Sequence, residues 1–157
     1  MRGDVIIVIA EDDEGHASLI IKNLQRIGIE NEMLHFRDGE ETLNFFFRKG
    51  EGPHVKSGTA YVLLLDVRMP KIDGLEVLRQ LKCDSVLQKM PVIMITTTDD
   101  PDEVERCHAL GCNVYISKPV DYDRFVKSMN HLGLFLRTSE FPKINDFRGE
   151  QTGHYGP

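Results

Sequence analysis

Five short apolar runs alternate along the chain with five amphipathic segments. Short runs rich in apolar and β-branched residues are typical of strands, and apolar residues at helical spacing are typical of helices. The strand-like runs are residues 5–10, 32–36, 60–65, 91–96 and 113–117, and the helical segments are residues 15–28, 39–50, 75–83, 102–111 and 122–136. Strands joined through single helices require right-handed crossovers, so the sequence predicts an α/β fold, a doubly wound (βα)5 parallel sheet with helices on both faces.

The run from Tyr61 to Leu65 is apolar throughout and is followed at once by Asp66. A strand without polar alternation is typical of the centre of a parallel sheet, where helices cover both faces. An ionised carboxylate is costly to bury. Asp66 therefore lies at the open carboxyl end of this strand, within reach of water, a metal or a cation, or it has a partner nearby.

Polar residues follow the other strand-like runs in the same way. Glu11, Asp12, Asp66, Thr96 and Lys118 all fall at or just beyond the carboxyl ends of predicted strands. In a five-stranded flavodoxin-like sheet of order 2-1-3-4-5, ligands bind at this edge, where the strand order reverses between the first and third strands. The predicted topology therefore brings Asp12 and Asp66 together.

Other acidic residues are predicted to begin helices. Asp73 precedes Glu76 by three residues, and Asp100 precedes Glu103 by the same spacing, which is the spacing of a helix capping box. Asp13 has two readings, as the cap of the first helix or as a further ligand of the acidic site, and the cap is favoured. These residues are therefore assigned to structure.

The chemistry of the predicted cluster points to a metal and a phosphoryl group. Crowded carboxylates repel one another, and a hard divalent cation such as Mg²⁺, which prefers oxygen ligands, relieves that repulsion. A carboxylate beside Mg²⁺ can attack phosphorus and form an aspartyl phosphate, while an ammonium and a hydroxyl stabilise the phosphoryl oxygens. Asp66, Lys118 and Thr96 supply these groups.

Four motifs occur in matching order on this framework: VIAEDDE around Asp12, DVRMPKIDG around Asp66, MITT around Thr96 and YISKP around Lys118. Together they resemble the receiver domain of two-component response regulators over residues 4–136. The resemblance implies that Asp66 accepts a phosphoryl group from a sensor histidine kinase and that Lys118 pairs with that group.

The same resemblance implies further roles. Asp12, Asp66 and the backbone carbonyl of Arg68 would hold Mg²⁺, with Glu11 acting partly through water. Thr96 and Tyr115 would be switch residues, Thr97 would contact the phosphoryl group, and the bond between Lys118 and Pro119 would be cis. Two alternatives stay open: Thr97 as a β-branched residue at a strand end, and Tyr115 as part of the core.

The loop at 49–59 and the segments around residues 84–107 and 133–144 are similar to stand-alone regulators of phytochrome-type sensor kinases. A regulator of this kind signals through protein contacts. A phosphorelay shuttle that also meets a histidine phosphotransfer protein, or a sink for phosphate, is the alternative. An aspartyl-phosphate hydrolase is disfavoured because Arg68 stands where such an enzyme needs a second aspartate. A flavodoxin-like cofactor binder is disfavoured because the EDDEGHA loop is acidic.

Composition excludes several other classes. The formal net charge of −6 argues against contact with a nucleic-acid backbone. The apolar runs are too short to span a membrane, and the N-terminus turns acidic too early for a signal peptide, so a cytoplasmic protein is expected. Three cysteines without a C-x-x-C pair indicate neither a disulfide framework nor a zinc site, and no role is predicted for the six histidines.

The last segment, residues 137–157, contains Pro142 and lacks a helical period, so it is predicted to be an extended arm. Phe141, Ile144 and Phe147 recur in it at three-residue spacing. We expect residues 137–147 to cross to a second copy and join two receivers in a symmetric homodimer. A disordered tail is the alternative, above all for residues 148–157.

Overall fold

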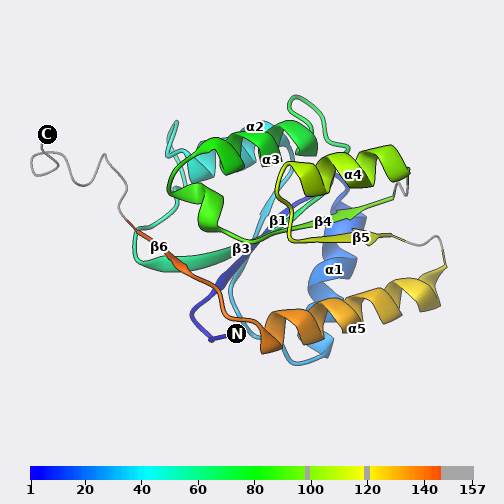
Figure 1. Ribbon diagram of the computed structural model, residues 1–157. Coiled ribbons are helices and arrows are strands. Elements are labelled where there is room, and N and C mark those ends of the chain that lie inside the picture. The colour runs from blue at the N-terminus through cyan, green and yellow to red at the C-terminus, as the bar shows by residue number, and fades with distance from the viewer. Residues whose placement is uncertain (98–99, 119–120, 146–157) are drawn as a thin grey trace, which may run out of the picture.

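The computed structural model describes residues 1–97, 100–118 and 121–145 (Figure 1). Within these residues five parallel strands form the main sheet in the order β2-β1-β3-β4-β5, which confirms the predicted fold class and strand order. The strands are β1 (Ile6–Ala10), β2 (Met33–Phe36), β3 (Thr59–Leu65), β4 (Val92–Thr96) and β5 (Val114–Ser117).

Helices cover both faces of this sheet. They are α1 (Glu14–Arg26), α2 (Gly39–Phe46), α3 (Gly74–Cys83), α4 (Pro101–Ala109) and α5 (Tyr122–Thr138), with a short 3-10 helix, η1 (Leu87–Lys89). Figure 1 shows α2, α3 and α4 on one face and α1 and α5 on the other. None of the helices in the described part of the chain has both the length and the apolar character that a membrane span needs.

Each of the five α-helices begins after an aspartate whose carboxylate accepts a backbone N–H of the first turn, at Asp13, Asp38, Asp73, Asp100 and Asp121. A side-chain acceptor at this position satisfies one of the N–H groups that the helix leaves without a partner. The capping roles predicted for Asp13, Asp73 and Asp100 are therefore confirmed.

Strand β3 lies between two hydrophobic cores. Leu63 and Leu65 pack into the core under α2, α3 and α4, whereas Val62 and Leu64 pack into the core under α1 and α5. All four side chains are almost fully buried. Successive side chains of a strand point to opposite faces, so a strand buried on both sides needs the uninterrupted apolar run seen in the sequence.

Helix α2 is shorter than the segment predicted from its periodicity, residues 39–50. It ends at Phe46, and Arg48 follows with φ of 59° and Gly50 with φ of 72°. Residues in this left-handed region cannot continue a right-handed helix. The backbone therefore turns away here and leads through the loop to β3.

The C-terminal arm contains a strand that the sequence did not predict. Helix α5 extends two residues beyond the expected end, to Thr138, and the chain then returns to pair β6 (Lys143–Ile144) antiparallel to the first two residues of β3. Pairing of β3 with β1 starts only at Tyr61 and with β4 only at Leu63, so this end of β3 projects beyond its neighbours. Ile144 is buried there.

Candidate phosphoacceptor site

Two strand ends bring three carboxylates together. The backbone N–H of Asp66 donates to the carbonyl of Ala10 at 3.0 Å, and that of Glu11 donates to the carbonyl of Phe36 at 3.0 Å, so the hydrogen-bonding pattern of the sheet continues past the strands. As a result, one carboxylate oxygen each of Glu11, Asp12 and Asp66 lie within 4.8 Å of one another. Glu11 and Asp66 are buried, and Asp12 is exposed.

Lys118 reaches the same cluster from the end of β5. Its backbone N–H donates to the carbonyl of Thr96 at 2.6 Å, which fixes the start of the side chain. The ammonium forms an ion pair with Glu11 and lies 3.5 Å from Oδ2 of Asp66. A buried ammonium is tolerated only with such partners, because removing it from water costs on the order of several kcal/mol.

Burial dominates the electrostatics of Glu11. It raises the pKa of this carboxyl from 4.5 to about 7, and the negative charge of Asp66 acts in the same direction, while the hydrogen bond from Lys118 lowers the pKa. Burial disfavours the ionised form of any carboxyl group, and a nearby like charge adds to that effect. A cation bound beside Glu11 would favour the ionised form.

The remaining predicted residues lie on or next to strands β4 and β5. Thr96 is fully buried, and its Oγ1 has no hydrogen-bond partner among the described residues. Thr97 is exposed, and Tyr115 is half-buried against the core under α2, α3 and α4. The predicted cis bond involves Pro119, which lies outside the described residues.

The backbone of Arg68 contacts the site, whereas its side chain lies at the surface. Its backbone N–H donates to Oδ1 of Asp66 at 3.3 Å, whereas its side chain points outward, with Nη2 3.7 Å from Oε2 of Glu103. Glu103 is buried on α4, and its other oxygen has no hydrogen-bond partner within the described residues. The loop after Asp66 is therefore tied to the first turn of α4.

Two histidines that the sequence analysis left without a role contact this site. His35 donates from Nε2 to the backbone carbonyl of Glu11 at 2.7 Å, and Nδ1 of His16 lies 3.4 Å from the ammonium of Lys118. The partners are 24 and 102 positions apart in the sequence, so no local motif indicates either contact.

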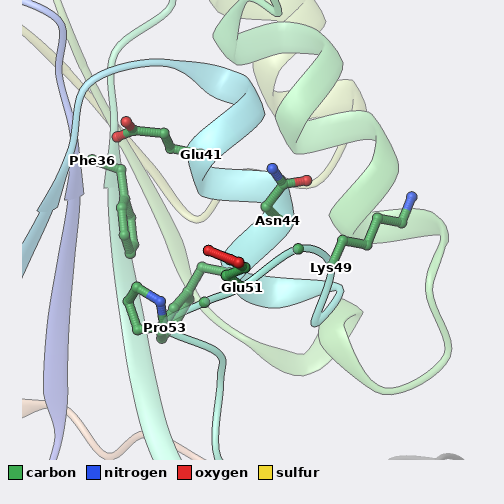
Figure 2. A pocket seen from close by; sticks show the side chains of 9 residues that line it. Phe36, Glu41, Asn44, Lys49, Glu51 and Pro53 are labelled. Atoms are coloured by element: carbon green, nitrogen blue, oxygen red, sulfur yellow. The ribbon is translucent and has the colours of Figure 1, made fainter.

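Among the hollows formed by the described residues, one adjoins the carboxylate cluster and another lies beside α2. A groove of about 710 Å³ adjoins the carboxylate cluster and is lined by Asp12, Val67, Arg68, Met69, Pro70, Asp73, Leu75, Glu103 and Arg106. A separate cavity of about 290 Å³ lies beside α2. Figure 2 shows Phe36 and Pro53 at its wall. Glu41 at the rim of this cavity already accepts the backbone N–H of Arg37. Asp12 of the carboxylate cluster lines the first of these hollows, and none of the three carboxylates lines the second.

Comparison with known proteins identifies the family. Residues 7–130 match the model of the response regulator receiver domain. The chain belongs to this family. The Rcp1 response regulator of Synechocystis is 32% identical over 138 residues, which cover 87% of this chain and 92% of that protein.

Solved receiver structures agree with this assignment. A receiver domain from Rhodospirillum rubrum superposes with a TM-score of 0.84 at 41% identity, covering 90% of this chain and 99% of that one. The phosphorylated cyanobacterial phytochrome response regulator RcpA superposes with a TM-score of 0.78 at 27% identity, covering 88% of this chain and 98% of that one. Rcp1 in its Mn²⁺-bound form gives 0.77 at 28% identity, covering 87% and 98%. The resemblance to phytochrome-associated regulators is therefore confirmed.

Proposed function

We propose that this receiver accepts a phosphoryl group on Asp66 from a sensor histidine kinase, in a reaction that depends on Mg²⁺. The observation that carries the proposal is the position of Asp66, whose carboxylate lies beside two further carboxylates and 3.5 Å from the Lys118 ammonium. A phosphoacceptor needs this combination, a nucleophilic oxygen with opposite charge nearby to stabilise the transferred group.

The residues present fit a divalent cation. Mg²⁺ prefers hard oxygen ligands. It would be held here by the carboxylates of Asp12 and Asp66 and the carbonyl of Arg68, with Glu11 acting through water. When bound, the ion neutralises charge on the phosphoryl oxygens and orients them. Mn²⁺-bound Rcp1 supports the assignment.

The proposed transfer uses groups that this chain supplies. An oxygen of the Asp66 carboxylate attacks phosphorus, the P–N bond of the donor phosphohistidine breaks, and the imidazole nitrogen keeps the electron pair. The Lys118 ammonium then pairs with a phosphoryl oxygen. The Thr96 hydroxyl, which has no partner among the described residues, donates to another. Attack of water on phosphorus later breaks the bond to the Asp66 oxygen, releases inorganic phosphate and restores the carboxylate.

The partner class follows from the relatives. RcpA is described as a phytochrome response regulator, which supports a phytochrome-type kinase as the donor here. Signalling would then proceed in the cytoplasm through protein contacts, with Thr96 and Tyr115 reporting the phosphorylated state and Thr97 contacting the phosphoryl group. A phosphorelay shuttle would in addition exchange its phosphoryl group with a histidine phosphotransfer protein.

We also propose that residues 137–157 form a C-terminal extension of the receiver, residues 4–136, and contribute to a homodimer. Ile144 is already buried in its own chain, so the contact would involve Phe141, which is partly exposed, or an exchange of β6 between two copies. Phe147 lies outside the described residues. Truncation after Leu136 is expected to convert the dimer to a monomer in light scattering. Equal masses for the full and truncated chains would reject this role.

The central test is the substitution Asp66→Asn. It should preserve the fold and abolish labelling by acetyl phosphate or a phosphorylated kinase, because the amide cannot act as the nucleophile. Asp73→Asn is the matched control, since asparagine also caps a helix and Asp73 lies in the same loop. A base-labile label retained by Asp66→Asn would show that another residue is the acceptor.

A further inference from the structure

The ammonium of Lys118 has a third neighbour besides its two carboxylates. A lysine ammonium offers three N–H donors, and the three acceptors within reach are Glu11 Oε1, Asp66 Oδ2 at 3.5 Å and His16 Nδ1 at 3.4 Å. Because Lys118 is buried, a donor without an acceptor would be costly. His16 therefore completes the hydrogen bonding of this ammonium.

The contact defines the part that His16 can play in it. An ammonium has no lone pair, so Nδ1 of His16 can bond to it only as an acceptor, which the ring tautomer with its proton on Nε2 provides. His16 is exposed, so its ring remains in contact with water while Nδ1 faces the site.

The backbone holds this ring in place. His16 lies in the first turn of α1, and its N–H donates to the carboxylate of the capping residue Asp13 at 3.0 Å. Asp13 in turn donates its own backbone N–H to Oε2 of Glu11 at 3.1 Å. The turn that carries His16 is thus linked to the same glutamate that pairs with Lys118.

We propose that His16 is a positioning residue for Lys118. A cation held by Asp12 and Asp66, with Glu11 acting through water, would take up the negative charge that otherwise attracts the ammonium, whereas the neutral imidazole nitrogen keeps its lone pair for Lys118. His16 then holds the ammonium beside Asp66, ready to meet the phosphoryl oxygens. This inference rests on the proposed phosphorylation of Asp66.

Nitrogen NMR tests the contact without phosphorylation. At about pH 8, where an ordinary histidine is neutral, the His16 ring should carry its proton on Nε2, and the Nδ1 resonance should move on substitution Lys118→Met. The exposed His131 on α5 is the reference, and its ring resonances should not move. A proton on Nδ1 of His16, or an Nδ1 resonance unchanged in Lys118→Met, would overturn the inference.

Labelling kinetics test the consequence. His16→Leu removes the hydrogen-bond acceptor and should slow Mg²⁺-dependent labelling of Asp66 by acetyl phosphate about three- to tenfold, the range that corresponds to the typical net contribution of one hydrogen bond. His16→Asn places Oδ1 where Nδ1 lies and should restore the rate to within about twofold, a rescue that a purely structural role for the ring would not give. His131→Leu should label at the wild-type rate.

The outcomes separate the two proposals. Equal rates for wild type, His16→Leu and His16→Asn reject the positioning role and leave Asp66 as the acceptor. Equal losses of labelling rate in both His16 variants also reject the positioning role, because a hydrogen-bond acceptor at position 16 then makes no difference. If the wild-type chain takes no label at Asp66, the proposed function fails, and the NMR experiment still decides whether His16 holds Lys118.

Discussion

Gly74 controls how closely helix α3 approaches the loop after Asp66, the proposed phosphoryl acceptor. A Cβ added at this position would lie 2.1 Å from the carbonyl oxygen of Asp66 and 2.8 Å from Cα of Val67. Both contacts are to backbone, which cannot rotate out of the way as a side chain can. The N–H of Gly74 also donates to the carbonyl of Val67 at 2.8 Å, so the helix and the loop are hydrogen-bonded at the same point.

The substitution Gly74→Ala therefore requires a displacement of helix or loop. Real Cβ atoms essentially never come closer than 3.0 Å to such neighbours, so one of the two backbones must shift by roughly 1 Å. Overpacking of this kind costs about 1–3 kcal/mol of the free energy of unfolding. A 1 Å misplacement of a reacting group can cost about a hundredfold in rate.

We expect Gly74→Ala to lower the melting temperature by about 4–8 °C for a loss of about 2 kcal/mol. Labelling of Asp66 by acetyl phosphate should slow by about a hundredfold at a temperature where the variant is folded. Circular dichroism and a labelling time course measure the two effects.

Gly133→Ala is the matched control. There the new Cβ meets the Cδ1 methyl of Ile27, 1.8 Å away, at the end of a side chain that can rotate. Alanine in a helix interior gains about 0.5–1 kcal/mol over glycine, which offsets part of the crowding. Its labelling rate should equal that of the wild type. Wild-type labelling in folded Gly74→Ala would refute the idea that this close approach positions the acceptor.

Two further predictions concern the ionisation of Glu11 and the C-terminal arm. The pKa of Glu11 is raised to about 7, so without metal the folded chain binds a proton on the Glu11 carboxyl more tightly than the unfolded chain does. The contribution of protonated Glu11 to the free energy of unfolding therefore falls as pH rises from 4.5 to about 7. Mg²⁺ requires the ionised form, so the increase in melting temperature on adding Mg²⁺ should be larger at about pH 8 than at about pH 6, and an increase independent of pH would contradict this. Ile144→Ala should lower the free energy of unfolding by about 2–4 kcal/mol in urea titration, since it empties a buried site; a change below about 0.5 kcal/mol would show that the arm does not pack on the core.

The sequence carried most of the information about the sheet. The apolar run before Asp66 identified the central strand because only a strand covered on both faces needs such a run. The carboxyl ends of parallel strands meet at one edge, so the convergence of Glu11, Asp12 and Asp66 followed from the strand order.

Features that depend on distant contacts could not be predicted in this way. β6 is two residues long and pairs only because the start of β3 projects beyond its neighbours, a property of the assembled sheet. The contact of His16 with Lys118 joins residues 102 positions apart and involves a histidine without any metal-ligand spacing. The end of α2 is a local feature, but it too could not be predicted, because Arg48 adopts a left-handed conformation for which this residue type has no preference.

The charges at the edge of the sheet where Asp66 lies explain why the ionisable side chains there are so closely coupled. Glu11, Asp12 and Asp66 bring three negative charges when ionised, and Lys118 returns one positive charge, so two negative charges are left without compensation. Partial protonation of Glu11 near neutral pH, which burial promotes, removes part of this excess. One divalent cation removes all of it. In the proposed reaction the same ammonium that balances the carboxylates also meets the phosphoryl group. A neutral hydrogen-bond acceptor such as the His16 ring can hold Lys118 in place while the charges around the ammonium change.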